Sequence, residues 1–304
     1  MLRSFKEILE AAREGAAKKL VVSCAEKRDM DLLGRATEAG LIIPCLVGDG
    51  SATETMIRGT LPASLDYEIV DEKDPVRALN RAIQLLTEGR ADIIMQGSTA
   101  HQAFLDAILN AKKGLRKGKL VSYISVFHLP KQEKLILVTD TFINNNPNLG
   151  EKQQILENAL RLAGILGIDT PKVAALAAIE QVNLSIPSTL DAAILSKMSQ
   201  RKQFGKAIVE GPLDIDCAVS EAAAGRKGLQ SVVTGSVDIY LVPEIDTGHL
   251  LAESLVFFGK METAGVIMGT EHPVILNLPF VSDENKISEI ALAALICGKR
   301  GNDA

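Results

Sequence analysis

Tryptophan is absent from this chain of 304 residues, and aromatic residues make up only 4% of it. Stacking platforms for single-stranded nucleic acid are therefore scarce. The formal net charge of −5 and the pI near 5.5 also argue against a broad nucleic-acid surface, because such a surface is basic. We expect no nucleic-acid partner, and a core built from aliphatic side chains.

Long apolar runs are missing as well. No run approaches the length of about 20 residues that a membrane-spanning helix needs. The N-terminal segment 1–19 is amphipathic and carries Glu7, Glu10 and Glu14, so it lacks the apolar core of a signal peptide. We expect a cytoplasmic protein with no membrane partner.

Cysteine and histidine are few, and their spacing does not suit a metal site. The cysteines form no C-x-x-C pair, and each lies in or beside an apolar run, which favours buried free thiols in a reducing compartment. The histidines are dispersed without ligand spacing, so no metal is predicted. The residues concerned are Cys24, Cys45, Cys217, Cys297, His101, His128, His249 and His272.

Common nucleotide-binding and hydrolase motifs are also absent. The chain has no P-loop, no G-x-S-x-G elbow and no H-E-x-x-H motif. Gly48-Asp49-Gly50 is a lone G-x-G, with Thr53 where a dinucleotide-binding fingerprint needs its third glycine. A nicotinamide-dependent dehydrogenase is therefore poorly supported.

What the chain does contain is an alternation of short apolar runs with amphipathic segments. This alternation predicts an α/β fold with a largely parallel sheet, and the length allows two domains. The runs on either side of Pro130 predict an antiparallel hairpin. Strands are expected at 19–23, 41–47, 91–95, 120–127, 134–139, 173–178, 208–209, 237–242 and 273–278. Helices are expected at 5–17, 29–39, 74–88, 102–111, 151–166, 188–197, 216–225, 250–260 and 286–297.

The segment 231–248 shows where such a fold would place a ligand. A turn at Thr234-Gly235 precedes the strand 237–242, and Pro243 then prevents further central pairing because it has no amide hydrogen. A polar loop follows, and a helical pattern begins at His249. Ligands of open α/β sheets bind at such junctions, and helix N-termini favour anions. An ordinary strand-loop-helix junction gives the same pattern.

Three loops that follow strands carry polar residues together with glycine or proline. A lining of backbone amides, one amide side chain and hydroxyls can hold a phosphate-bearing ligand through many modest hydrogen bonds. For Asp140 and Asp216, capping of a local turn is the alternative. The loop residues are Asp140, Asn144 and Pro147; Gly211, Pro212, Leu213 and Asp216; and Ser231, Thr234, Gly235, Asp238 and Pro243.

Five segments, in this order and spacing, resemble the phosphate acetyl/butyryltransferase family, closest to its phosphate butyryltransferase branch. The resemblance spans about residues 19–294. Its segments are GLRKGKLVS (114–122), TDTFINNNPNLGEKQQILENAL (139–160), IEQVNLSIPSTLDAAILSKM (179–198), VEGPLDIDCAVSEAAA (209–224) and VTGSVDIYLVPEIDTGHLLAESLVFF (233–258).

The resemblance implies an α/β fold of the isocitrate and isopropylmalate dehydrogenase type, with a cleft between two domains. Domain I would comprise residues 1–148 plus 265–304, and domain II residues 149–264. A homodimer or larger assembly is implied. The implied reaction converts acyl-CoA and phosphate into acyl phosphate and CoA, with no metal and no cofactor besides these substrates.

This chemistry needs a base for the CoA thiol, donors for the oxyanion and a clamp for phosphate. By position, Asn144 would orient the substrate, and Ser231 with the Thr234–Gly235 backbone would bind phosphate or the acyl oxygen. The predicted catalytic residues are Asn144, Ser231 and Glu284, with Asp283 as an alternative base. The predicted binding residues are Arg116, Asp140, Pro147, Gly211, Asp216, Thr234, Gly235, Pro243, Gly248 and His249.

The chain departs from the family pattern at several positions where the family has polar or charged residues. The family Ser-Arg pair is matched by Leu278-Pro279, and Val281 stands where the butyryl branch often has Asp. Asp106 replaces a second arginine, and His249 replaces an asparagine. Each lost charge-assisted contact costs on the order of 1.5–3 kcal/mol.

His249 and His101 could donate hydrogen bonds in place of the missing groups. Two functions therefore remain open beside the poorly supported dehydrogenase. The first is acyl transfer between CoA and phosphate. The second is a CoA-ester-binding paralogue with altered or lost catalysis.

Overall fold

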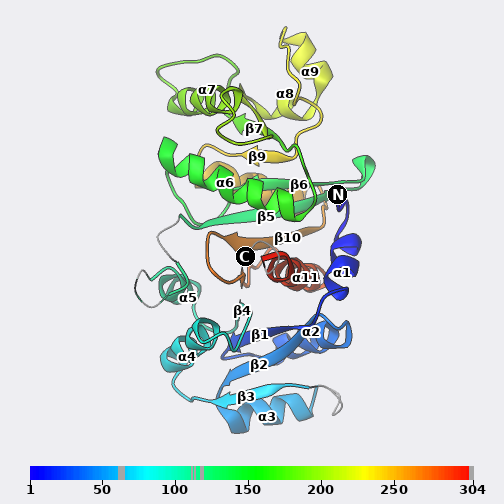
Figure 1. The fold of residues 1–304 in the computed structure, drawn as a ribbon, viewed down its shortest axis with the longest axis vertical. Coiled ribbons are helices and arrows are strands. Elements are labelled where there is room, and N and C mark those ends of the chain that lie inside the picture. Colours follow the sequence, from blue (N-terminus) through cyan, green and yellow to red (C-terminus); the bar gives the residue numbers. More distant parts are fainter. Residues whose placement is uncertain (61–65, 111, 113, 117–119, 301–304) are drawn as a thin grey trace. The chain divides into compact units, whose positions relative to one another are not determined.

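The structure is a computed structural model, and it describes residues 1–60, 66–110, 112, 114–116 and 120–300. It has a mixed α/β fold made of two compact units (Figure 1). Unit 1 comprises Met1–Ser4 and Ser122–Glu262, and unit 2 comprises Phe5–Val121 and Thr263–Ala304. In the described part of the chain, no helix is long and apolar enough to cross a membrane.

The strands of unit 2 follow the order β3-β2-β1-β4-β11-β10, and all neighbours except β10 and β11 are parallel. The chain runs from β1 to β2 on one side and later returns to β4 on the other side. The carboxyl ends of β1 and β4 therefore form a switch point, where open α/β sheets bind ligands. These strands are β1 (Lys18–Ser23), β2 (Ile42–Gly48), β3 (Glu68–Asp71), β4 (Ile93–Gln96), β10 (Thr263–Met268) and β11 (Val274–Ile275).

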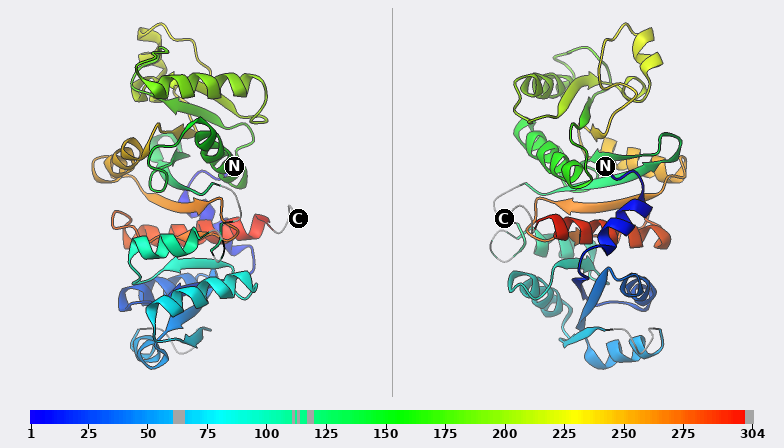
Figure 2. Two further views of the ribbon diagram at one scale, coloured as in Figure 1. Left: turned by 90° about the vertical axis from the view of Figure 1, so that its left-hand side faces the viewer. Right: turned by 45° about the vertical axis from the view of Figure 1, so that its right-hand side comes forward.

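Two helices of unit 2 begin at aspartate caps that the sequence supplies. Asp49 and Asp74 each accept a backbone N–H of the following helix, α3 or α4. The last helix, α11, packs against α1 and β10 and is largely buried, as its apolar pattern predicts (Figure 2). The helices are α1 (Phe5–Arg13), α2 (Lys27–Glu38), α3 (Gly50–Arg58), α4 (Pro75–Thr87), α5 (His101–Ile108) and α11 (Asp283–Arg300).

Unit 1 has the strand order β5-β6-β9-β7-β8. The antiparallel hairpin of β5 and β6 is confirmed, and the other pairs are parallel. The strands are β5 (Ser122–Leu129), β6 (Lys134–Thr139), β7 (Lys172–Leu176), β8 (Ile208–Leu213) and β9 (Ile239–Leu241). The helices are α6 (Leu149–Ile165), α7 (Pro187–Gln200), α8 (Ile215–Val219), α9 (Glu221–Arg226) and α10 (Ile245–Phe257), with a 3-10 turn η1 (Pro130–Gln132) in the hairpin.

Two helix predictions need correction. The helix predicted to open at His249 begins at Ile245, because the Glu244 carboxylate accepts the N–H groups of Asp246 at 3.0 Å and Thr247 at 3.1 Å. The single helix predicted at 216–225 is divided into α8 and α9. Ser220 divides it, since its backbone is extended and its side chain caps α9.

The compact units group residues 122–148 with unit 1, where β6 pairs with β9. The predicted domain division places these residues with the first domain instead. That division, at residues 148 and 264, stays a prediction.

Candidate functional site

The loop after β6 is built around the carboxylate of Asp140, which is 3% exposed. It accepts the backbone N–H groups of Phe142 at 2.8 Å and Ile143 at 3.0 Å. Both the backbone and the side-chain amide of Asn144 also donate to it, at 3.2 Å and 2.5 Å. Burial raises the pKa of Asp140, while these donors stabilise its charged form. Asp140 therefore caps the loop and fixes the orientation of Asn144.

Helix α10 packs on this loop through Gly248. A Cβ at Gly248 would lie 2.4 Å from the carbonyl oxygen of Asp140 and 2.9 Å from Val242 Cγ2. Only glycine permits this approach. The N–H of Ile245 also donates to the Asn145 carbonyl at 3.0 Å. The structure therefore brings the predicted Asp140, Asn144 and Gly248 together.

His249 lies beside the same loop. Its ring centroid is 5.5 Å from that of Phe142, and its Nε2 is 3.4 Å from the Glu253 carboxylate. Pro147 is buried further along the loop. These residues and the Asp140 loop form one cluster at the carboxyl ends of β6 and β9.

Ser231, Thr234 and Gly235 lie elsewhere in unit 1. They precede β9, whereas the Asp140 loop follows β6. The segment reaches the amino end of β6 at Ser236, whose carbonyl accepts Lys134 Nζ at 2.8 Å, and the Ser231 turn lies beside β8, where the Glu210 carboxylate accepts the N–H of Val232 at 3.3 Å. Ser231 Oγ accepts the N–H groups of Val233 and Thr234, both at 3.2 Å, and so closes its own turn.

Ser231 and Thr234 line a hollow of about 430 Å³ that also contains Glu210 and Glu221. Gly235 follows with a φ of 72°, and a Cβ there would lie 2.9 Å from Glu221 Cγ, so the turn requires glycine. An anion in this hollow would meet two carboxylates, which disfavour it. The hollow suits hydrogen-bond donors better than phosphate.

Asp216 belongs to an ion-pair cluster, which we define as Glu180, Asp214, Asp216 and Lys227. The Lys227 ammonium lies 2.5 Å from Glu180 and 2.9 Å from Asp216, and it also pairs with Asp214. Lys227 lowers the pKa of Glu180 to about 2, and the three carboxylates raise the pKa of Lys227. The cluster joins the segment before α7 to α8 and the end of α9.

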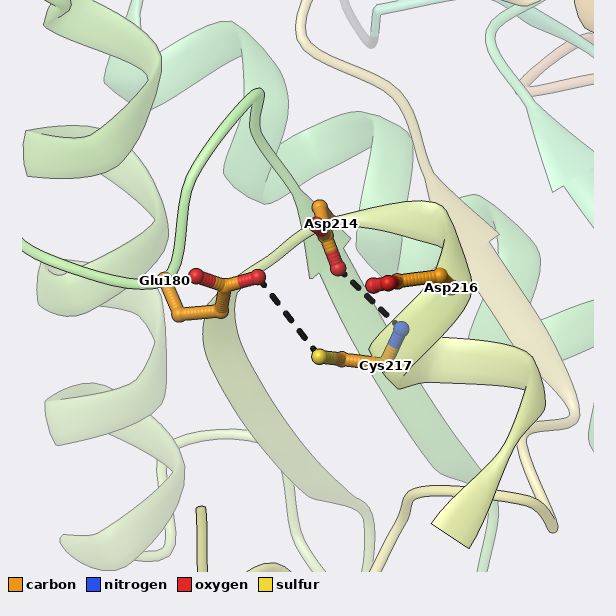
Figure 3. Close-up of side chains that lie close together, drawn as sticks. All are labelled: Glu180, Asp214, Asp216 and Cys217. Carbon is orange, nitrogen blue, oxygen red and sulfur yellow. Dashed lines mark hydrogen bonds between the residues drawn. The ribbon is translucent and has the colours of Figure 1, made fainter. Parts of the chain in front are cut away.

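The carboxylates of this cluster and Cys217 offer ligand atoms within 4.8 Å of one another, a spacing that a metal ion could use (Figure 3). Lys227 already supplies positive charge to the three carboxylates. Burial raises the pKa of Cys217 to about 12, whereas a metal ligand must be a thiolate. We interpret the cluster as an ion-pair network.

Gly211 and Pro243 lie in tightly packed parts of unit 1. A Cβ at Gly211 would lie 2.6 Å from the carbonyl oxygen of Ala175 in β7. Pro243 lines a small hollow beside the ion pair of Lys152 and Asp191, whose atoms are 2.7 Å apart. The contacts of both predicted residues are those of packing positions.

Arg116 and Glu284 are the predicted site residues of unit 2. Arg116 is exposed, and its backbone forms an isolated bridge with Thr270. Glu284 is exposed in the first turn of α11. Residues 117–119, which continue the resembling segment after Arg116, lie outside the described residues.

A further polar cluster lies at the switch point of unit 2, around Gln96 at the end of β4. Gln96 is 5% exposed, and its Nε2 donates to the Thr99 carbonyl at 2.9 Å. Its Oε1 accepts the backbone N–H of Asn277 at 3.1 Å and lies 3.2 Å from Nδ1 of His101. Gln96 is not among the residues predicted from the sequence, although an apolar strand that ends in Gln-Gly-Ser-Thr is a signal for a polar site of this kind.

The comparisons with known proteins bear on this geometry. Residues 64–294 match a family model described as phosphate acetyl/butaryl transferase. A phosphate butyryltransferase from Clostridium acetobutylicum is 38% identical over 301 residues, which cover 99% of this chain and 100% of that protein. The chain belongs to this family. A phosphate acetyltransferase from Thermotoga maritima, 35% identical over 291 residues, covers 95% of this chain and 98% of its own length.

Solved structures of phosphotransacylases have a similar fold. A branched-chain phosphotransacylase from Enterococcus faecalis V583 has a TM-score of 0.80 at 27% identity, covering 92% of this chain and 99% of that one. A phosphotransacetylase from Streptococcus pyogenes has a TM-score of 0.82 at 18% identity, covering 97% and 99%. The second likeness shows the fold alone. The full-length similarity supports acyl transfer over the paralogue and dehydrogenase alternatives.

This member of the phosphate acetyl/butyryltransferase family has an apolar segment after β11. Leu278, which matches the family serine, is 1% exposed, and Val281 is 5% exposed. Pro279, at the arginine position, is exposed. Asp106 is exposed and accepts a hydrogen bond from Gln102 at 2.8 Å. The side chains at the Ser and Asp positions therefore pack into unit 2 and carry no polar group.

Proposed function

We propose that this chain transfers acyl groups between CoA and phosphate, with a short acyl chain such as butyryl. The observation that carries the proposal is the 38% identity to a phosphate butyryltransferase over 99% of the chain. The substrates would bind in a cleft between two domains arranged as in isocitrate dehydrogenase. The reaction would need only acyl-CoA and phosphate, without a resident cofactor or metal.

In the forward direction, a phosphate oxygen attacks the thioester carbonyl carbon and the carbon–sulfur bond breaks. The CoA sulfur leaves and takes up a proton. In the reverse direction, the thiol loses that proton before it attacks the acyl phosphate. The site must therefore hold the carbonyl, supply donors to its oxygen as charge develops, and exchange one proton.

Asn144 suits the orienting role, because the buried Asp140 carboxylate holds its amide at 2.5 Å. Arg116 would supply positive charge to phosphate. The hollow lined by Ser231 and Thr234 also contains Glu210, so we assign it to the amide N–H groups of the pantetheine arm. The role of Glu284 as the base is a prediction from the sequence alone.

A thiol-release assay with butyryl-CoA and inorganic phosphate tests the proposal. We expect CoA thiol to appear only when both substrates are present. If no thiol appears but butyryl-CoA still raises the Tm, the chain is a CoA-ester binder instead. Consumption of NADH with a 2-oxo acid, or its formation with a 2-hydroxy acid, would support the dehydrogenase.

We further propose that the chain assembles as a homodimer or larger oligomer through an apolar surface of unit 1. Ile215 and Val219 on α8 are 45% and 49% exposed, and Leu250 on α10 is 65% exposed. Ile215 and Val219 line a hollow of about 260 Å³ together with Leu251 of α10. Exposed apolar surface of this kind marks protein–protein contacts. The cytoplasmic location expected from the sequence stays a prediction.

A further inference from the structure

The orientation of the Gln96 side chain determines the tautomer of His101. The backbone N–H of Asn277 can only donate, so the side-chain atom that it meets at 3.1 Å is the amide oxygen, Oε1. Gln96 Nε2 meets the carbonyl oxygen of Thr99, which can only accept. Both contacts require the same orientation of the amide. The atom 3.2 Å from His101 Nδ1 is therefore an acceptor, and Nδ1 carries the proton.

A neutral imidazole with its proton on Nδ1 has its lone pair on Nε2. A histidine whose Nδ1–H is held by an acceptor, with Nε2 as the basic atom, is the arrangement in which imidazole works as a general base. We propose that His101 is the general base of the acyl transfer, with Gln96 as the residue that positions it. This inference rests on the proposed function.

The surroundings of His101 are compact, and its Nε2 is buried, so the substrate thiol must displace the groups that cover this atom in order to reach it. His101 is the first residue of α5, at the switch point of unit 2. Ser23, in register with Gln96 across β1 and β4, is 0% exposed, and its Oγ has no hydrogen-bond partner among the described residues. Residues in parallel register point to the same face of the sheet, so the Ser23 hydroxyl lies on the face where the Gln96 side chain lies.

The protonation state of His101 is also the one that a general base needs. Burial lowers the pKa of His101, so the ring is neutral at neutral pH and can accept a proton. The elements around it carry both acidic and basic groups, and Asp106 on α5 is already tied to Gln102. The charged and titratable groups nearest to it in the fold are those of α4 with its caps and of α5, the thiol that follows β1, and those lining the small hollow beside Gln96: Asp74, Arg77, Arg81, Glu88, Asp106, Cys24, Asp29, Lys286 and Glu289.

In the proposed step, His101 Nε2 takes the proton of the CoA thiol as the sulfur attacks the carbonyl carbon of the acyl phosphate. The carbon–sulfur bond forms, the bond from carbon to the phosphate oxygen breaks, and the proton passes from Nε2 to the departing phosphate. In the forward direction the same nitrogen takes the proton of hydrogen phosphate and returns it to the CoA sulfur. No further reactant is required.

Steady-state kinetics of the full-length protein with butyryl phosphate and CoA, followed from pH 5 to 8, test the assignment. We expect His101→Asn to lower kcat about 100-fold or more, as loss of a general base does, with a much smaller change in KM. Gln96→Glu places a carboxylate beside Nδ1–H, which favours the imidazolium. It should move the acid limb of kcat to higher pH by about one unit. His128→Asn, at the end of β5 in unit 1, is the matched control.

Glu284→Gln provides the competing outcome. If it removes the acid limb while His101→Asn retains most of kcat, Glu284 is the base and the inference is wrong. Nitrogen-15 NMR of the histidine rings gives a readout apart from activity: wild-type His101 should show the Nδ1–H tautomer, and the Nε2–H tautomer would contradict the proposal. Circular dichroism establishes that each variant is folded. A wild type that releases no thiol in either direction overturns the proposed function and this inference together, whereas an active wild type with an unaffected His101→Asn overturns the inference alone.

Discussion

Single buried side chains organise two of the polar loops in the described part of the chain. Asp140 collects donors from the loop after β6, and Gln96 joins the loop after β4 to the segment after β11. In both cases one side chain satisfies backbone groups that burial would otherwise leave without partners. Asp140 therefore fixes the position of Asn144, and Gln96 fixes that of His101.

Asp140→Asn tests whether the loop after β6 depends on the buried carboxylate. The amide keeps one acceptor, and when its oxygen still accepts from Phe142 and Ile143 its NH₂ group faces the two N–H donors of Asn144. We expect the free energy of unfolding to fall by about 2–3 kcal/mol, the scale of a lost charge-assisted bond with unsatisfied donors. Urea unfolding measures the change. The exposed Asn146→Ala is the control, and equal stability of the two variants would show that the loop does not depend on the carboxylate.

At the level of elements, close backbone contacts fix how helices meet loops. Gly248 lets α10 touch the Asp140 carbonyl, and Gly211 lets β8 approach β7. Both glycines serve contacts between segments that are far apart in the sequence. Neither contact can be inferred from local propensity.

Gly248→Ala should therefore be strongly destabilising. Its Cβ would lie 2.4 Å from a backbone oxygen that cannot move without the loop. We expect a loss of about 2 kcal/mol or more, comparable to overpacking in a core. Gly164→Ala in α6 is the matched control, because nothing lies within 4 Å of the added Cβ. That variant should gain about 0.5–1 kcal/mol from helix propensity in thermal or urea unfolding. If Gly248→Ala and Gly164→Ala changed the free energy of unfolding by similar amounts, the close contact at Gly248 would not be the cause.

The ion-pair cluster around Lys227 gives α8 and α9 a pH-dependent support. The folded pKa of Glu180 is about 2 against an ordinary 4.5, so its contribution to stability is complete above 4.5 and is lost as the pH falls toward 2. The raised pKa of Lys227 makes its contribution complete below 10.5 and lost at higher pH. Lys227→Met should lower the Tm by a few degrees at pH 7, since three carboxylates then repel one another.

The variant should also flatten the loss of Tm between pH 4.5 and 2 that the wild type shows. Differential scanning calorimetry across this range measures both effects. The exposed Lys206→Met should follow the wild type. A Lys227→Met protein whose Tm falls with acid as steeply as the wild type would show that the cluster does not carry the effect.

Sequence periodicity predicted most elements but not all. Continuous apolar runs located β1, β2, β4 and β6 closely, because a buried strand needs such a run. Periodicity did not predict α3, the short strand β3, or β10, which contains glycine. It also placed the start of α10 too late. Asp246, Thr247 and Gly248 look like a loop by composition, but Glu244 satisfies their N–H groups and makes them helical.

For the candidate site, sequence order was a weaker guide than for the fold. Asn144 and Gly248 were expected in one place, and their contact through Asp140 agrees with that expectation. Ser231 was expected beside them, but its turn lies beside Glu210 of β8. Gln96 and Asn277 are 181 residues apart, so their contact could not be inferred without the fold. The roles of all these residues stay proposals.

The molecule as a whole combines a family fold with an exposed apolar surface on unit 1. Val219→Glu would place a charge among Ile215 and Leu251 at the hollow of α8 and α10. We expect it to shift the mass measured by light scattering from that of a dimer to that of a monomer, because burying an unpaired carboxylate is costly. Val76→Glu on α4, where the native valine is 69% exposed, is the control. An unchanged mass for Val219→Glu would place the interface elsewhere.

Leu278 is buried among apolar side chains, and this limits how the usual family motif could be introduced into this chain. Leu278→Ser would remove a leucine side chain that is 1% exposed. Such truncations of buried side chains lower the free energy of unfolding by about 2–5 kcal/mol. That is a large part of the 5–15 kcal/mol by which a typical domain is stable. Gains in stability elsewhere would have to come first.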